Sequence, residues 1–370
     1  MCFIRTLLLV TLLVLGGCAE RASNTPTLSH TELSSSLETP TSPSRNPRIV
    51  FLDVGQGDSA LVQFTNGQTM LIDGGETDQG RGLVARLRQR GVRQLDWVVA
   101  SHAHSDHIGG LIQVLREFPV REVWDSGFRH DSPVYLDYLR AVRSARTPDG
   151  GRPKFRVVKR GERLQVGSEA VVEVLAPSQP YLTGTRSDPN NNSIVMRLQF
   201  GSVRVLFTGD MEREQRTRLY REGVNLRAEV LKVAHHGAHN GTDPTFLSRV
   251  QPKVAVISCG RNNRYGHPHR ETLQALQRAG VKIYRTDLQG EVQIEIAGKQ
   301  LRVATARKAP NVAEMRSPTE RTRLIGNRNS KVYHAPDCPR LPRKENQVFF
   351  SSRQQAEAQG YRPHAECLGE

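Results

Sequence analysis

Residues 97–110 read Trp97-Val98-Val99-Ala100-Ser101-His102-Ala103-His104-Ser105-Asp106-His107-Ile108-Gly109-Gly110, an apolar run followed by three histidines and an aspartate. Imidazole and carboxylate groups are the ligands that zinc, manganese and iron take from proteins. Side chains two apart in an extended segment share a face, so His102 and His104 can bind one ion. Asp106 and His107, at the turn, can face a second ion about 3.5–4 Å away. The segment therefore predicts a two-metal site at the end of a buried strand; a solvated, histidine-rich loop is the alternative.

The first 18 residues have the layout of an export signal. A positive charge within residues 1–5 precedes an apolar run from Thr6 to Leu15, and Leu15-Gly16-Gly17-Cys18 resembles a bacterial lipobox. The resemblance implies an exported protein that is lipid-anchored through Cys18 to the cell envelope, on its periplasmic or extracellular face. An uncleaved transmembrane anchor is the alternative, although the apolar run is shorter than the roughly 20 residues that span a bilayer.

The remaining chain divides by composition and periodicity. Residues 19–46 are rich in Ser, Thr, Pro and Glu and predict a disordered tether. A large domain is expected over 47–306, a charged, proline-interrupted linker over 307–324, and a small domain over 325–370.

Apolar patterns in the large domain predict early hairpins followed by alternating strands and helices. Strands are expected at 48–54, 59–64, 69–72, 95–100, 193–200, 203–207, 230–234, 254–257, 281–284 and 291–296, and helices at 80–91, 111–118, 212–222 and 269–279. Asp73, the 102–107 cluster, Asp210 and the pair His235-His236 each follow a strand. Because the ends of neighbouring strands lie side by side, these groups should meet at one edge of an α+β sandwich of sheets flanked by helices.

This order of motifs resembles the metallo-β-lactamase superfamily. Five segments, at 51–59, 102–110, 206–210, 232–237 and 265–269, look like the hydrolase domain of the ComEC family of competence proteins. The resemblance covers about residues 48 to 298. It implies an αββα sandwich and hydrolysis by a water activated by two divalent ions, zinc or manganese. No long apolar segment follows the signal, so the membrane channel of that family is not expected.

The resemblance assigns metal ligands residue by residue. His102 and His104 would bind the first ion, Asp106 and His107 the second, and Asp210 would bridge the two. The last ligand would be His236, with His235 facing the substrate, although either of these two histidines could take the metal. The implied ligands are His102, His104, Asp106, His107, Asp210 and His236.

Four further roles follow from the same resemblance. Asp106 could also orient the attacking water, and Asp73 would orient ligands from behind. His267 and His269 would contact phosphate or donate a proton to the leaving oxygen. A loop held by hydrogen bonds is the alternative for these two histidines.

One segment departs from the superfamily pattern. Many members supply a third histidine to the first ion from mid-chain, whereas Asp188-Pro189-Asn190-Asn191-Asn192-Ser193 offers amides. The ComEC-like pattern also has asparagine there. An amide oxygen or a water could complete the site, which would favour a harder ion such as manganese.

The small domain carries a second candidate metal site. His334 with Cys338, and His364 with Cys367, form two pairs whose spacing suits a closed structural zinc site. The layout resembles the zinc-binding, DNA-contacting domain of the Ada repair protein. His334 stands where that family has its methyl-accepting cysteine, so methyl transfer is not expected. A Cys338–Cys367 disulfide is the alternative, because an exported protein permits one.

The net charge of +15 favours polyanionic partners such as nucleic acid, although a merely soluble basic surface is the alternative. Together these features predict an exported phosphodiesterase or nuclease that acts on DNA, in uptake or degradation, and contacts the membrane through its lipid anchor. A hydrolase of wall phosphodiesters or a small ester is one alternative, and a DNA-binding protein with an inactive centre is another. A β-lactamase is less expected, because this fold hosts many chemistries. No protein partner is indicated.

Overall fold

The computed structural model describes residues 46–308, 324–335, 338, 340–350 and 353–368. The predicted signal, Cys18, nearly all of the tether and most of the linker lie outside these residues. Within the described ranges, no helix is both long enough and apolar enough to cross a membrane.

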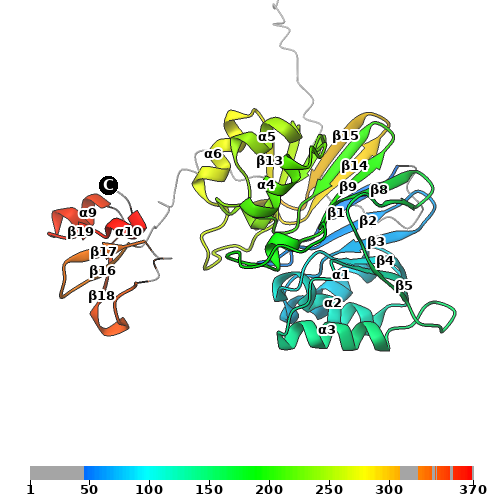
Figure 1. The fold of residues 1–370 in the computed structure, drawn as a ribbon, viewed down its shortest axis with the longest axis horizontal. Coiled ribbons are helices and arrows are strands. Elements are labelled where there is room, and N and C mark those ends of the chain that lie inside the picture. The colour runs from blue at the N-terminus through cyan, green and yellow to red at the C-terminus, as the bar shows by residue number, and fades with distance from the viewer. Residues whose placement is uncertain (1–45, 309–323, 336–337, 339, 351–352, 369–370) are drawn as a thin grey trace, which may run out of the picture. The chain divides into compact units, whose positions relative to one another are not determined.

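Residues 46–308 form two mixed sheets that pack face to face (Figure 1). The first sheet has the strand order β15-β14-β1-β2-β3-β4-β5-β6. Its strands are β1 (Arg48–Phe51), β2 (Ala60–Gln63), β3 (Thr69–Ile72), β4 (Leu95–Ala100), β5 (Val120–Asp125), β6 (Lys154–Val157), β14 (Val292–Ala297) and β15 (Gln300–Thr305). The second sheet has the order β13-β12-β11-β10-β9-β8-β7. Its strands are β7 (Arg163–Val166), β8 (Ala170–Ala176), β9 (Val195–Phe200), β10 (Val203–Phe207), β11 (Val230–Lys232), β12 (Val254–Ile257) and β13 (Lys282–Arg285).

Helices cover the outer face of each sheet, because each strand alternates apolar side chains toward both sides. The inner faces meet in one core that includes Phe51, Val62, Met196 and Phe207. A second core lies under α1 (Gly80–Gln89), α2 (Ser105–Glu117) and α3 (Pro133–Ser144), and a third under α4 (Arg213–Arg221), α5 (Pro244–Val250) and α6 (Arg270–Arg278). Short helical turns complete the domain at η1 (Thr77–Gln79), η2 (Asn190–Asn192), η3 (Ala234–Gly237) and α7 (Thr286–Gln289). These layers confirm the predicted αββα sandwich.

Helix α2 begins six residues earlier than the sequence predicts, at Ser105 instead of Leu111. Gly109 and Gly110 weaken the helical pattern of the sequence here, because glycine is a poor helix former. Their packing explains them: a Cβ on Gly110 would lie 2.0 Å from the carbonyl oxygen of Gly74, and one on Gly109 would lie 2.4 Å from the nitrogen of Thr77. The N-terminal half of α2 therefore sits directly against the segment after β3, and His107 lies on a helix and not in a turn.

The small domain is built on a four-stranded sheet with the order β18-β16-β17-β19. Its elements are β16 (Leu324–Asn327), β17 (Val332–His334), η4 (Lys344–Asn346), β18 (Gln347–Phe350), α9 (Arg353–Ala358), β19 (Arg362–Pro363) and α10 (Ala365–Leu368). Its core comprises Leu324, Tyr333, Phe350, Ala356 and Tyr361. So small a core suits a domain stapled by a metal.

Candidate functional site

The predicted ligands of the large domain converge from both sheets. His102, His104, Asp106 and His107 follow β4 and open α2, Asp210 follows β10, and His236 lies in η3 after β11. The sandwich therefore brings together the ends of three strands that are far apart in sequence.

Ligand atoms of four residues meet at the predicted position of the second ion. Nε2 of His236 lies 3.2 Å from Oδ2 of Asp106 and 3.3 Å from Oδ2 of Asp210, and Nε2 of His107 lies 3.2 Å from Oδ1 of Asp210. Ligand atoms that each sit about 2.0–2.2 Å from one ion lie about 3–3.5 Å apart. The spacing of this group fits a shared ion.

The bonding of these atoms also fits a metal. Nε2 of His107, Nε2 of His236 and Oδ1 of Asp210 are buried and make no well-directed hydrogen bond within the described residues. Burial lowers the pKa of both imidazoles, but Asp210 and the other carboxylates around them raise it well above its ordinary value. The carboxylates therefore favour positive charge at this position, which a divalent cation would supply.

The residues predicted for the first ion also lie close to Asp210. Nε2 of His102 is 3.1 Å from Nδ1 of His104 and 3.9 Å from Oδ2 of Asp210. Burial lowers the pKa of both imidazoles, which keeps their lone pairs free for a metal. Two imidazoles and a carboxylate leave this position short of a fourth protein ligand.

Hydrogen bonds behind the ligands fix which ring nitrogen faces the centre. Nδ1 of His107 donates to Oδ2 of Asp73 at 2.9 Å, and Oδ1 of Asp73 accepts from the backbone N–H of Ser101 at 2.8 Å. Nδ1 of His236 donates to the carbonyl oxygen of Ser258 at 3.0 Å. Both histidines therefore direct Nε2 inward. Asp73 lies behind the ligands, and its role in orienting them stays a prediction.

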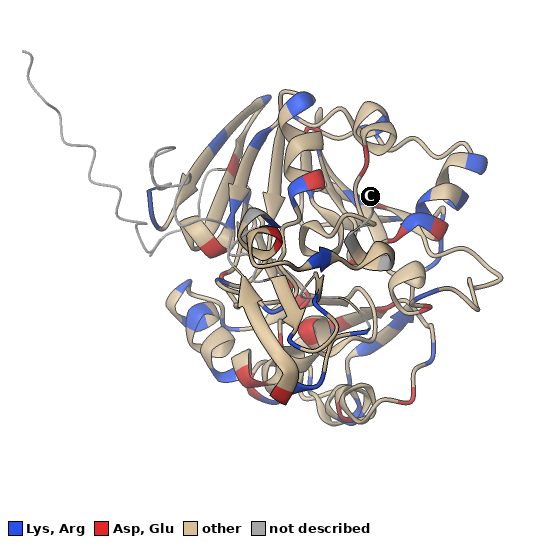
Figure 2. Cartoon of the chain, turned by 90° about the vertical axis from the view of Figure 1, so that its left-hand side faces the viewer, with Lys and Arg blue, Asp and Glu red and all other residues tan. Residues whose placement is uncertain are grey.

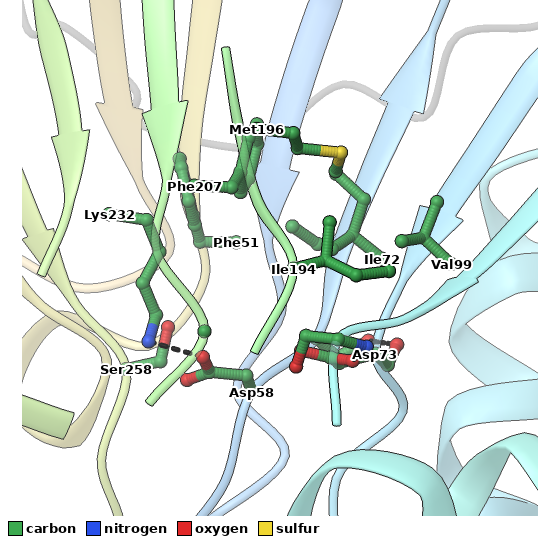
Figure 3. A pocket seen from close by; sticks show the side chains of 14 residues that line it. Phe51, Asp58, Ile72, Asp73, Val99, Ile194, Met196, Phe207, Lys232 and Ser258 are labelled. Atoms are coloured by element: carbon green, nitrogen blue, oxygen red, sulfur yellow. Dashed lines mark hydrogen bonds and ion pairs between the residues drawn. The ribbon is translucent and has the colours of Figure 1, made fainter. Parts of the chain in front are cut away.

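Asp58 and Lys232 are functional candidates that the sequence analysis missed. Oδ1 of Asp58 lies 3.2 Å from Nδ1 of His236, and the other carboxylate oxygen pairs with the buried ammonium of Lys232. Figure 3 shows this pair beside Ser258, below apolar side chains of the core between the sheets. Burial raises the pKa of Asp58, but Lys232 and His236 hold it below its ordinary value. Asp58 ends the run 53–58 after the first strand, and Lys232 precedes the paired histidines. These positions in the sequence could have marked the two residues as candidates.

His235 and His236 share an uncommon backbone conformation. Their φ angles are 50° and 54°, in the left-handed region that costs energy for residues with a Cβ. Both rings lie near Asp210: Nε2 of His236 is 3.3 Å and Nε2 of His235 is 3.8 Å from its Oδ2. His236 enters the ligand group, while Nδ1 of His235 lies 3.1 Å from Oδ1 of Asn240.

Hydrogen bonds fix the tautomer of His267. Oε1 of Gln56 accepts from the backbone N–H of Gly260 at 3.2 Å, so its Nε2 donates to Nδ1 of His267 at 3.5 Å. Nδ1 is then an acceptor, and the proton of the neutral ring resides on Nε2. Burial and the neighbouring His236 lower the pKa of His267 to about 3. His267 is thus a neutral hydrogen-bond donor.

His269 is held by the loop around it. Its Nδ1 accepts from the backbone N–H of His239 at 3.1 Å, and its Nε2 donates to the carbonyl oxygen of Tyr265 at 3.1 Å. Both ring nitrogens are occupied, which matches the loop-holding alternative. A catalytic role for His269 stays a prediction.

A pocket of about 400 Å³ opens over the ligand group. Its lining includes His104, Asp106, Asp210, His235, His236 and His267. Arg186 and Arg264 also line it; both are exposed, and neither forms an ion pair within the described residues. The pocket therefore combines the candidate metal ligands with two arginines and two further carboxylates, Glu76 and Glu212. Arg264 also donates a hydrogen bond to the hydroxyl of Tyr265.

The four predicted ligands of the small domain also come together. The ligand atoms of His334, Cys338, His364 and Cys367 lie within 4.8 Å of one another. Sγ of Cys338 is 3.3 Å from Nδ1 of His334 and 3.8 Å from Nδ1 of His364, spacings that suit tetrahedral zinc. The two cysteines are not joined by a disulfide.

Comparisons with known proteins identify both domains. A family model described as the metallo-beta-lactamase superfamily matches residues 52–261, and one described as the metal binding domain of Ada matches residues 313–370. ComE operon protein 3 of Bacillus subtilis (strain 168) is 33% identical over 260 residues, which cover 65% of this chain and 32% of that protein. Competence protein ComA of Neisseria gonorrhoeae is 30% identical over 252 residues, covering 68% of this chain and 32% of that protein. The chain thus spans about a third of the length of these curated relatives.

Among solved structures, the metallo-beta-lactamase fold protein YhfI from Bacillus subtilis has a TM-score of 0.44 at 15% identity, over 68% of this chain and 100% of that chain.

Proposed function

The chain belongs to the metallo-β-lactamase superfamily and ends in an Ada-type metal-binding domain, and from this premise we propose that it is a phosphodiesterase that cleaves nucleic acid. That it is a metal-dependent hydrolase related to competence proteins follows from the family and its relatives. The phosphodiester substrate is the proposed part.

The observation that carries the proposal is the pair of arginines that lines the pocket. Arg186 and Arg264 line the pocket beside the metal ligands and form no ion pair in the described structure, and a guanidinium is well suited to bind phosphate oxygens. Elsewhere in the view of Figure 2, Lys and Arg are scattered over many elements and interspersed with Asp and Glu. The local pair therefore supports a phosphate ligand more strongly than the overall charge does.

The residues of the pocket suit hydrolysis of such an ester. Divalent ions held by the ligand group would lower the pKa of a water and neutralise charge on the phosphate. Asp106 lies beside that position and can orient the water. The fixed Nε2–H of His267 can donate to the leaving oxygen without carrying a charge of its own.

The test is cleavage of linear single-stranded and double-stranded DNA by the purified protein with manganese or zinc. We expect cleavage that a chelator and the His104→Ala variant abolish. Replacing Arg186 and Arg264 together by Gln should raise KM more than it lowers kcat, because the two arginines hold phosphates outside the reacting group. Hydrolysis of a phosphodiester dye without cleavage of DNA would point to a wall phosphodiester or small ester. Binding of DNA without turnover would contradict the catalytic proposal.

Location and recruitment are further parts of the proposal. We propose that the protein is exported and anchored by a lipid on Cys18, and that the Ada-type domain holds nucleic acid near the pocket. The lipobox-like segment and the relation to competence proteins support this arrangement. Labelling with a radioactive fatty acid should mark the natural protein and leave Cys18→Ser unlabelled.

A further inference from the structure

The first metal position needs one more protein ligand. His102, His104 and Asp210 converge there, and the segment from which the superfamily often supplies another histidine contains Asn190, Asn191 and Asn192. The three asparagines form η2, and all three are buried. The hydrogen bonds of Asn190 differ from those of Asn191 and Asn192.

The amide oxygens of Asn191 and Asn192 both accept hydrogen bonds from the backbone, and their amide nitrogens also have partners. Oδ1 of Asn191 accepts from the backbone N–H of Gln215 at 3.1 Å, and its Nδ2 donates to Glu214 at 3.0 Å. Oδ1 of Asn192 accepts from the backbone N–H of Leu182 at 3.0 Å, and its Nδ2 donates to two carbonyl oxygens at 2.8 Å. Neither oxygen is available to a ligand.

Asn190 differs from Asn191 and Asn192 because its amide oxygen accepts no hydrogen bond in the described structure. Its Nδ2 donates to Oε1 of Glu212 at 2.9 Å, which fixes the amide orientation and leaves Oδ1 as the free end. That Oδ1 is buried and has no hydrogen-bond partner in the described structure, as is the case for Nε2 of His107 and Nε2 of His236. Of the three asparagines, Asn190 is the one that lines the pocket over His104 and Asp210.

We propose that Oδ1 of Asn190 is the protein ligand that completes the first metal position beside His102, His104 and Asp210. An unpaired buried carbonyl oxygen costs free energy unless something binds it. A cation in the pocket it lines provides that partner, and Glu212 holds the amide in the orientation that presents oxygen.

The proposal has a consequence for metal choice. Two nitrogens and two oxygens form a harder ligand set than three imidazoles with a carboxylate, so the first position should favour manganese relative to zinc more than a histidine-rich site does. Restoring a histidine should reverse this preference.

The test is a manganese titration of the full chain, with free Mn²⁺ followed by electron paramagnetic resonance. We expect Asn190→Ala to weaken one manganese site by at least about tenfold, since even residues behind metal ligands contribute that much. Asn190→Asp, which keeps an oxygen, should retain both sites, and Asn190→His should shift competition toward zinc. The cysteine-rich site of the small domain is the same in every variant and has little affinity for manganese.

Asn192→Ala is the matched control. It removes an asparagine that binds only the main chain, so it should lower the free energy of unfolding while leaving manganese affinity unchanged. Equal manganese affinity and stoichiometry in the natural protein and Asn190→Ala would overturn the inference. If the alanine variant does not fold, an unchanged metal preference in Asn190→His overturns it instead. The readout is metal binding, so failure of the nucleic-acid proposal would leave this result intact.

Discussion

The buried pair Asp58–Lys232 gives a sharp prediction about stability. Methionine at 232 keeps most of the packing of the lysine stem but removes its charge, leaving the Asp58 carboxylate buried without that partner. Both side chains are less than a tenth exposed, at 4% for Lys232 and 8% for Asp58. Breaking a buried pair on one side costs about 3–5 kcal/mol. We therefore expect Lys232→Met to lower the free energy of unfolding by that amount.

The double variant Asp58→Asn/Lys232→Met isolates the interaction. Removing both charges leaves no uncompensated ion, so the double variant should be less destabilised than Lys232→Met, with a coupling of at least about 2 kcal/mol. Urea unfolding in a chelator at pH 7 measures this without a contribution from bound metal. Both tryptophans, Trp97 and Trp124, lie in the large domain, so fluorescence reports on that domain. A loss below about 1 kcal/mol in Lys232→Met, or strict additivity in the double variant, would refute the reasoning.

Three further predictions address packing, pH and the small domain. Gly110→Ala should destabilise the large domain by about 1–3 kcal/mol, because its Cβ meets backbone at 2.0 Å, whereas Gly82→Ala on helix α1 meets only a flexible arginine tip and should cost nothing in urea unfolding. Burial lowers the pKa of His267 from 6.5 to about 3. Between these values the unfolded chain binds a proton that the folded chain does not, so the free energy of unfolding should fall by about 1.4 kcal/mol per pH unit as pH decreases. In the His267→Asn variant, the free energy of unfolding should lack this contribution to its fall between pH 6 and 4.5. A slope equal to that of the natural protein would contradict the prediction. Cys338→Ser should remove one zinc ion per chain and expose Cys367 to alkylation, both measurable by mass spectrometry; an unchanged zinc content would exclude the site.

Much of the fold was predictable because its signals are local. Asn66-Gly67, a dipeptide that favours hairpin turns, lies between β2 and β3. Strands β4, β9, β10 and β12 lie within the segments where apolar runs predict strands. The start of α2 was not predictable from periodicity. Gly109 and Gly110 weaken the helical pattern for a reason that lies outside the helix, namely close contact with the loop after β3.

The candidate site was likewise predictable from sequence only in part. Histidines and aspartates clustered within a few residues, or placed directly after strands, predict ligands without knowledge of the fold. Asp58 and Lys232 are separated by most of the domain, and neither position alone indicates a buried pair. The distinction among Asn190, Asn191 and Asn192 is likewise invisible in sequence, because it depends on which amide oxygen the surrounding backbone leaves free.

The position of β1 in the first sheet constrains the order in which the domain folds. Arg48 to Phe51 pair on one side with β2 and on the other with β14, whose residue Glu295 lies 247 positions after Arg48. Contacts this distant in sequence form slowly, and the central apolar strand keeps an open edge until almost all of the domain is available. A chain that stops before Val292 should therefore aggregate through β1 and not fold into a smaller stable unit. During synthesis, the domain can complete this sheet only after β14 has been made.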